Sequence, residues 1–152
     1  MTNTNQNPGV QNYPFEEYGN GFWLPPKVLQ GIISCQNHFQ SQDCDIILST
    51  FPKCGTTWLK AFIFTIINRN KHSPLSQEYP LLTKNPHALV PYLEMDLYVA
   101  NKTPDFSSFT TPRLLATHPP IGLLPKSVVE SKCNLVYICK NPKDTFVSFW
   151  CF

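Results

Sequence analysis

The sequence predicts an α/β fold in which a central parallel sheet lies between two layers of helices. Three short, continuous apolar runs carry this prediction, near residues 45–50, 113–117 and 135–139. Continuous runs of β-branched and other apolar residues are typical of strands that are buried on both faces. Two of the runs are followed by a tight turn and by helix-start residues, which is the order of strand-to-helix units in a parallel sheet.

The overall composition is that of one globular domain. The 152 residues include 42% hydrophobic and 13% aromatic residues, and this content is too hydrophobic for a disordered chain. The formal net charge is only +2, so no overall field favours nucleic acid or an anionic membrane as a partner. We therefore expect no nucleic-acid partner and no membrane partner, and any anion site must be built locally.

Cysteine spacing and hydropathy favour a cytoplasmic location. The six cysteines match no CxxC pair and no regular disulfide framework, so we expect free thiols. No apolar stretch reaches the roughly 18 to 20 residues of a membrane span. The first residues are polar and do not resemble a signal peptide.

The first two predicted elements are an arm and a helix. Residues 1–20 are rich in Asn, Gln, Pro and Gly and have no apolar period, so we expect a flexible N-terminal arm. Pro25 and Pro26 suit the first turn of a helix, and apolar residues then recur at helical spacing. This pattern predicts a helix over Pro26–His38.

After the first predicted strand, a turn at residues 51–55 leads into a second helix. The apolar stripe predicted for this helix comprises Trp58, Leu59, Phe62, Ile63, Ile66 and Ile67. The following segment, from Arg69 to Pro112, carries six prolines and therefore predicts short helices and loops. Within it, Asn85 followed by Pro86 predicts a capped helix start.

The last predicted elements repeat the strand-to-helix order. His118 follows the second predicted strand, and a short helix is expected near residues 125–129. After the third strand, Asn141 and Pro142 predict the start of a final helix. This helix carries aromatic residues without partners from later sequence: Phe146, Phe149, Trp150 and Phe152. We therefore expect a truncated domain with exposed apolar surface.

The strongest functional signal is the turn within residues 51–60, between a buried strand and a helix N-terminus. The first N–H groups of a helix have no intrahelical partner and can bind an anion together. Gly55 lets the backbone approach closely, and Lys53 adds a mobile charge. In the alternative interpretation, Gly55 is only a turn residue and Thr56 only a helix cap. The spacing is not that of a Walker A loop, which disfavours a P-loop kinase or NTPase.

The string PKCGTTWLK, which begins at Pro52, resembles the 5′-phosphosulfate loop of the cytosolic sulfotransferases. The resemblance implies a P-loop-like three-layer fold and a site for the sulfuryl donor 3′-phosphoadenylyl sulfate (PAPS). The residues that it implies for cofactor binding are Lys53, Cys54, Gly55, Thr56, Thr57 and Trp58. The two threonines would add hydroxyl donors to the backbone N–H groups of the loop.

A second match covers residues 137–150 and resembles the 3′-phosphate motif of the same family. In that family an arginine opens the motif and a serine near its end completes the phosphate contact. The corresponding residues are Lys140 and Ser148. Lysine keeps the charge but lacks the planar fork of arginine, so we expect a weaker and less directional contact. The alternative makes Lys140 a solvated loop charge and Ser148 an ordinary helix serine.

A third match, residues 113–120, resembles the family's R-x-x-x-T-H segment, in which the histidine is the catalytic base. The resemblance implies that His118 is this base. His118 follows the carboxyl end of a predicted strand, where ligands of open α/β sheets bind. Imidazole, with a pKa near ~6.5, can take a proton near neutral pH. His38, His72 and His87 are interpreted as ordinary surface or core histidines.

The resemblance extends from about Gly21 to the last residue, takes in residues 85–94 and is to the plant branch of the family. It covers roughly the first half of a family domain. Residues 21–152 are therefore expected to form the N-terminal half of a sulfotransferase domain. The implied reaction moves a sulfuryl group from PAPS to a hydroxyl of a small acceptor, such as a phenol, flavonoid or steroid. It needs no metal, and His118 and Lys53 would be its catalytic residues. The alternative is a truncated nucleotide-binding fragment without catalysis, and the sequence specifies neither the acceptor nor the oligomeric state.

Overall fold

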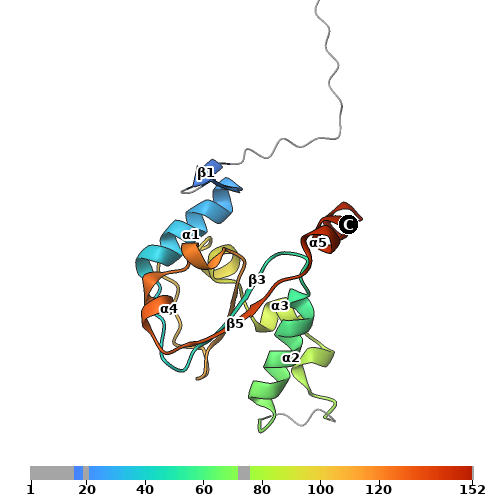
Figure 1. The fold of residues 1–152 in the computed structure, drawn as a ribbon. Coiled ribbons are helices and arrows are strands. Elements are labelled where there is room, and N and C mark those ends of the chain that lie inside the picture. The colour runs from blue at the N-terminus through green and yellow to red at the C-terminus, as the bar shows by residue number, and fades with distance from the viewer. Residues whose placement is uncertain (1–15, 19–20, 72–75, 152) are drawn as a thin grey trace, which may run out of the picture.

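From residue 26 onward, helices and parallel strands alternate along the chain (Figure 1). The computed structural model describes residues 16–18, 21–71 and 76–151, so most of the predicted arm lies outside the described residues. The strands are β1 (Glu16–Tyr18), β2 (Phe22–Leu24), β3 (Ile46–Thr50), β4 (Leu114–Thr117) and β5 (Asn134–Ile138). The α-helices are α1 (Pro26–His38), α2 (Thr56–Asn68), α3 (Pro86–Leu89), α4 (Lys126–Glu130) and α5 (Pro142–Trp150). Shorter helical turns are η1 (Pro80–Leu82), η2 (Leu93–Leu97) and η3 (Ile121–Leu123).

A three-stranded parallel sheet with the order β4-β3-β5 forms the centre of the structure. Ile47 of β3 lies opposite Leu115 of β4 and Leu135 of β5. Each predicted strand end lies at the observed end or next to it. The predicted parallel sheet is therefore confirmed. The prediction succeeded because a continuous apolar run marks a strand that is buried on both faces.

Helices cover both faces of this sheet, as predicted (Figure 1). On one face, Ile47 packs in a cluster with Cys35 of α1 and Val128 of α4. On the other face, Leu48 and Ala116 pack against the apolar side of α2. Neighbouring residues of a strand point to opposite faces, so the same continuous runs supply both cores of the three-layer fold.

Helix α2 departs from its predicted apolar stripe. Leu59, Ile63 and Ile67 pack against the sheet side. By contrast, Trp58 is 84% exposed and Phe62 is 63% exposed. The predicted stripe therefore includes residues that the sheet does not cover, because spacing alone does not show how much of a helix is contacted. The exposed residues agree with the expected apolar surface.

Two helices begin at the predicted asparagine caps. The Asn85 side chain accepts a hydrogen bond from the N–H of His87 (2.9 Å) at the start of α3. The Asn141 side chain accepts one from the N–H of Lys143 (3.0 Å) at the start of α5. Each bond satisfies an N–H group that has no partner inside its helix. Helix α1 also has its predicted bounds.

Helix α1 lies against η2, a single π-helical turn that the sequence pattern did not predict. A Cβ atom added to Gly31 of α1 would lie 2.0 Å from the backbone oxygen of Glu94. Only glycine therefore allows α1 and η2 to approach this closely. Single π turns are frequent at functional sites, and this one carries Glu94.

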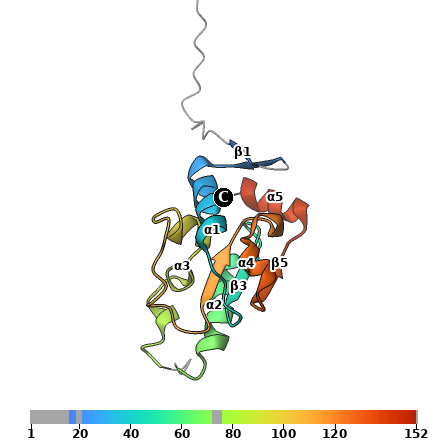
Figure 2. The ribbon, with the colours of Figure 1, turned by 90° about the vertical axis from the view of Figure 1, so that its left-hand side faces the viewer.

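A small hairpin of β1 and β2 precedes α1 (Figure 2). The hydroxyl of Tyr18 donates a hydrogen bond to Gln36 of α1 (2.9 Å), and Gln36 in turn donates to the carbonyl of Leu123 (2.9 Å). Gly21 has a φ of 83° between the two strands. The hairpin was not predicted, because strands of three residues are too short to show an alternating pattern.

Candidate functional site

The connections after β3, β4 and β5 meet at the carboxyl end of the parallel sheet. Thr50 lies opposite Ile138 at the ends of β3 and β5, and Ser49 lies opposite Thr117 at the end of β4. The helix after β3, α2, covers one face, and the helix after β4, α4, covers the other. Where successive connections diverge in this way, a crevice forms that binds ligands in open α/β folds.

The connection after β3 has the backbone of an anion-binding loop. Lys53 has a φ of 67° and Gly55 a φ of 92°, both in the left-handed region. At a non-glycine residue this conformation costs roughly 1–3 kcal/mol, and it persists mainly at functional sites. Gly55 is also the N-cap of α2, which has 13 residues. The first N–H groups of α2 and the left-handed turn therefore offer backbone donors and a positive potential to an anion.

The predicted cofactor-binding side chains divide into an inward and an outward group. Cys54 and Thr56 are buried, and Thr56 Oγ1 lies 2.7 Å from Thr50 Oγ1. Thr57 and Trp58 are exposed, Trp58 to 84%. The inward side chains hold the loop on the sheet, whereas the outward hydroxyl of Thr57 can reach a bound anion.

His118 directly follows β4, and its ring is oriented by the end of β3. His118 Nδ1 lies 2.6 Å from the carbonyl oxygen of Thr50. A carbonyl oxygen can only accept, so Nδ1 carries the proton and Nε2 of the neutral ring keeps a free lone pair. Burial lowers the pKa of His118 below its ordinary value, which favours the neutral ring at pH 7. Nε2 can therefore accept a proton from a neighbouring group.

Glu94 holds the backbone of His118 in place. The residue is 1% exposed, and its carboxylate accepts hydrogen bonds from the N–H of His118 (2.8 Å) and the hydroxyl of Thr117 (3.0 Å). Burial raises the pKa of Glu94 to about 7. Sequence reasoning included Glu94 in the family-like segment but gave it no role, because the contact joins positions 24 apart.

Lys60, His87 and Tyr92 form a second cluster next to His118. The ring centroid of Tyr92 lies 4.5 Å from that of His118 and 5.6 Å from that of His87. The Lys60 ammonium lies 3.2 Å from the centroid of Tyr92 and 3.1 Å from His87 Nδ1. The interpretation of His87 as an ordinary histidine missed this cluster. One available signal was Lys60, the single charged residue of α2.

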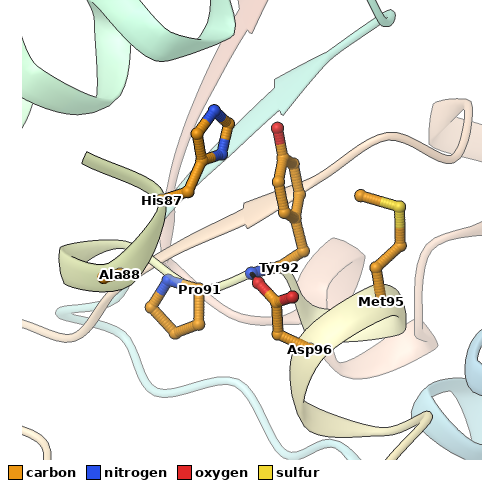
Figure 3. Close-up of a pocket in the computed structure, with 6 residues that line it drawn as sticks. All are labelled: His87, Ala88, Pro91, Tyr92, Met95 and Asp96. Atoms are coloured by element: carbon orange, nitrogen blue, oxygen red, sulfur yellow. Dashed lines mark hydrogen bonds between the residues drawn. The ribbon is translucent and has the colours of Figure 1, made fainter. Parts of the chain in front are cut away.

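An open pocket of about 590 Å³ lies beside this cluster (Figure 3). It is lined by His87, Ala88, Pro91, Tyr92, Met95 and Asp96. In Figure 3 the rings of His87 and Tyr92 stand side by side. Asp96 accepts a hydrogen bond from the N–H of Tyr92 (2.7 Å), which fixes the start of η2. The pocket combines an aromatic wall with a carboxylate at its edge.

Lys140 and Ser148 belong to the connection after β5 and to α5. Two contacts join α5 to the loop after β3: Cys54 Sγ lies 3.8 Å from Thr145 Oγ1, and the rings of Phe51 and Phe149 are 6.1 Å apart. Lys140 is exposed and Ser148 half-buried. Both lie at the same end of the sheet as Lys53, and their contact with a 3′-phosphate stays a prediction.

Arg113, the first residue of the third motif, has a structural position away from His118. Its Nε donates to Asp45 Oδ1 (2.7 Å), and its Nη2 donates to the carbonyl of Gln40 (3.0 Å). Asp45 is fully buried. The pair ties the amino end of β4 to the residue before β3, so the two ends of this motif serve different purposes.

The structure also bears on metal ions, membranes and disulfides. Within residues 16–18, 21–71 and 76–151, no group of three His, Cys, Asp or Glu side chains is placed to hold a metal ion. In the same residues, no helix has the length and apolar character needed to cross a membrane. The six cysteines have free thiols, as predicted from their spacing.

The family model and the curated relatives that match this chain name one activity, sulfotransferase. A family model described as a sulfotransferase domain matches residues 43–152. Cytosolic sulfotransferase 12 of Arabidopsis thaliana is 52% identical over 134 residues, which are 87% of this chain and 40% of the relative. The chain spans between 37% and 42% of the length of the first curated relatives that it matches.

Solved structures agree with this comparison. An Arabidopsis thaliana crystal structure, provisionally named a steroid sulphotransferase, is 49% identical, with a TM-score of 0.81 over 90% of this chain and 48% of that chain. The mouse sulfotransferase SULT7A1, solved in complex with PAP, is 23% identical, with a TM-score of 0.62 over 91% of this chain and 43% of that chain. The comparison with the mouse protein shows that the fold is shared at low sequence identity.

Proposed function

The chain belongs to the sulfotransferase family, and we propose that it binds PAPS and transfers the sulfuryl group to a hydroxyl of a small acceptor. One observation carries this proposal. His118 Nδ1 is oriented by the carbonyl of Thr50, and Thr50 directly precedes the loop with the left-handed residues Lys53 and Gly55. A group that can accept a proton therefore stands next to a loop that can bind an anion.

In the proposed reaction, PAPS supplies an activated sulfuryl group and leaves as adenosine 3′,5′-bisphosphate (PAP). His118 Nε2 takes the proton of the acceptor hydroxyl as the hydroxyl oxygen forms its bond to sulfur. Lys53 neutralises charge on the phosphate oxygen whose bond to sulfur breaks. The N–H groups of residues 55–58 hold the 5′-phosphate. Positioning and charge stabilisation carry most of the catalysis, as in phosphoryl transfer, and no metal is needed.

Lys140 and Ser148 are proposed to hold the 3′-phosphate of the donor. Support comes from their place after β5, beside the loop that would hold the 5′-phosphate. The Lys140 ammonium contributes a point charge without a bidentate fork. The acceptor is proposed to enter from the side of Tyr92, whose ring lies 4.5 Å from the ring of His118.

Replacing His118 tests the proposed base. The 152-residue chain would be incubated with sulfur-labelled PAPS and a panel of phenols, flavonoids and steroids. His118→Ala should lower transfer by about 10²-fold or more and leave PAP binding, measured by calorimetry, unchanged. His38→Ala is the matched control, because His38 is an exposed residue at the end of α1. Substantial transfer by His118→Ala would contradict the assignment.

A second candidate function is nucleotide binding without catalysis. It is favoured by Lys140, which lacks the planar fork of the arginine that opens the matching family motif. The same assay separates the candidates: PAP binding with no transfer to any acceptor supports the second, and labelled product supports the first.

A cytosolic location is part of the proposal. It is supported by the names of the related Arabidopsis proteins, which are cytosolic sulfotransferases. A fluorescent fusion of the chain should therefore distribute through the cytosol, and accumulation at a membrane or in a secretory compartment would contradict this part.

A further inference from the structure

A line of hydrogen bonds runs from a buried ammonium group to the surface of the anion-binding loop. Lys60 Nζ lies 3.1 Å from His87 Nδ1, and His87 Nε2 lies 3.0 Å from Thr57 Oγ1. Lys60 has no exposed surface, whereas Thr57 is exposed at the first turn of α2. His87 therefore joins the interior of the α2 layer to the loop proposed for the 5′-phosphosulfate.

The chemistry of these groups fixes the direction of each hydrogen bond. An ammonium group has donors and no acceptor, so His87 Nδ1 must accept and carries no proton. Burial and the neighbouring Lys60 lower the pKa of His87, so its ring is neutral and its one proton sits on Nε2. Burial lowers the pKa of Lys60 to about 8, and the group still carries its charge at neutral pH. His87 Nε2 therefore donates to Thr57 Oγ1.

This direction decides what the Thr57 hydroxyl offers to a ligand. A hydroxyl that already accepts from an imidazole N–H keeps its own proton for another acceptor. With the opposite tautomer, Thr57 would donate to His87 and present lone pairs to a bound anion, which would repel it. The position of the ring proton on His87 thus decides whether the Thr57 hydroxyl attracts or repels a bound anion.

We propose that His87 is a positioning residue: held in one tautomer by Lys60, it directs the hydroxyl of Thr57 to donate to the 5′-phosphosulfate of the bound donor. The inference rests on the proposed function, because it names a residue that prepares the same loop for the same ligand. In this role His87 and Lys60 act through the side chain of Thr57 and not through contacts with the loop backbone.

The surroundings hold His87 rigidly enough for this role. Asn85 accepts a hydrogen bond from the His87 N–H (2.9 Å), which fixes the residue in the first turn of α3. The ring stacks on Tyr92 with an angle of 26° between the ring planes. The Lys60 ammonium lies over the same Tyr92 ring, at 3.2 Å from its centroid, and a cation in this position is attracted to the ring. A ring with a stacking neighbour, a hydrogen bond at each nitrogen and a fixed backbone has little freedom to turn.

Two substitutions of His87 separate hydrogen bonding from packing. His87→Gln keeps an acceptor for Lys60 and an N–H donor for Thr57, but removes the aromatic ring. His87→Phe keeps an aromatic ring against Tyr92, but removes both polar atoms. Calorimetry with the full chain would compare PAP, which has a 5′-phosphate, with adenosine 3′-monophosphate, which lacks one. Circular dichroism checks that each variant is folded.

The expected result is specific to the 5′-phosphate. His87→Phe should weaken PAP binding about tenfold, the scale of one hydrogen bond to a charged group, and His87→Gln should stay within about twofold of the unsubstituted chain. Binding of adenosine 3′-monophosphate should be the same in all three proteins. A packing role for the ring predicts the reverse order of the two variants, and that order would overturn the inference. Equal losses for both nucleotides would also overturn it.

A second measurement does not depend on the nucleotide. Nitrogen chemical shifts of the His87 ring should show a bare Nδ1 and a protonated Nε2 in the unliganded chain. The opposite tautomer would overturn the inference and leave the proposed function standing. If the expected tautomer is found but the unsubstituted chain binds PAP no better than adenosine 3′-monophosphate, both the proposed function and the inference fail.

Discussion

The two edge strands of the parallel sheet, β4 and β5, are both apolar in sequence but differ in burial. In β4, Leu115 and Ala116 have no exposed surface, whereas Leu135 and Tyr137 of β5 are 39% and 55% exposed. The segment before η2 also extends the sheet beyond β4, since the N–H of Ala116 donates to the carbonyl of Pro91 (3.0 Å). The proposed base follows the well-packed strand, and the proposed 3′-phosphate contacts follow the exposed one.

This difference teaches that the two halves of the candidate site have different mechanical support. His118 is fixed by Glu94 and Thr50, each of which is itself buried. Lys140 follows β5 and Ser148 lies on α5. Both elements carry exposed aromatic residues, Tyr137 on β5 and Phe146 and Trp150 on α5. The position of the proposed base is therefore fixed by buried residues, whereas the proposed phosphate contacts after β5 and in α5 depend on a more weakly packed layer.

The largest expected effect is on stability and compares one leucine from each edge strand. Leu115→Ala should lower the free energy of unfolding by about 2–5 kcal/mol, because it opens a cavity in the core between the sheet and α1. Leu135→Ala should lower it by less than about 1 kcal/mol, because the side chain is already partly in water. Urea unfolding monitored by circular dichroism measures both. Equal losses of unfolding free energy in the two variants would contradict the difference in packing between β4 and β5.

Two glycine substitutions test the packing of α1 against η2, which supports the β4 half of the site. Gly31→Ala should cost about 1–3 kcal/mol, because the new Cβ would collide with the backbone of Glu94 and force η2 away from α1. Gly122→Ala is the control, because an added Cβ there meets no atom within 4 Å. The same urea experiment applies, and a Gly31→Ala chain as stable as the Gly122→Ala chain would show that α1 and η2 can separate freely.

Glu94 should make the stability of the β4 half depend on pH. Its pKa is raised from 4.5 to about 7 in the folded chain. Between these values the folded state binds more protons than the unfolded state, so the free energy of unfolding falls as pH rises from about 4.5 to about 7. Glu94→Gln removes this contribution. Urea unfolding at pH 5 and pH 8 should show a steeper decline in the unsubstituted chain, and identical slopes would contradict the buried acid.

The smallest effect concerns ligand affinity on the β5 side. Lys140→Arg should tighten PAP binding by roughly three- to tenfold, because a planar guanidinium can make two parallel hydrogen bonds to one phosphate. Lys143→Arg is the matched control, since Lys143 is an exposed residue one turn further along. Calorimetry measures both affinities. If neither variant binds more tightly, Lys140 does not face the 3′-phosphate.

Local signals predicted most of the fold. The strands around Ile47, Leu115 and Leu135 follow from runs of apolar residues, and the starts of α3 and α5 follow from asparagine caps next to proline. Each of these signals acts over a few residues, so the sequence displays it directly. The hairpin of β1 and β2 and the π turn η2 were not predicted, because short strands and single turns have no sequence period to detect.

The candidate site was predictable where a motif is continuous and unpredictable where contacts cross the chain. The loop around Gly55 and the position of His118 could be read from adjacent residues. The roles of Lys60 and His87 depend on α2 and α3 packing together, which brings positions 27 apart to 3.1 Å. Glu94 likewise acts on a residue 24 positions away. Spacing along a sequence carries no direct information about such pairs.

The left-handed backbone at Lys53 sets stability against the proposed activity at a single residue. A glycine there would adopt the same φ of 67° at no steric cost and would relax the loop. It would also remove the ammonium group proposed to meet the leaving phosphate. Selection for a more stable protein alone would therefore favour Lys53→Gly, and selection for turnover would oppose it. In this conformation Lys53 keeps its proposed catalytic ammonium group at the expense of an easier backbone.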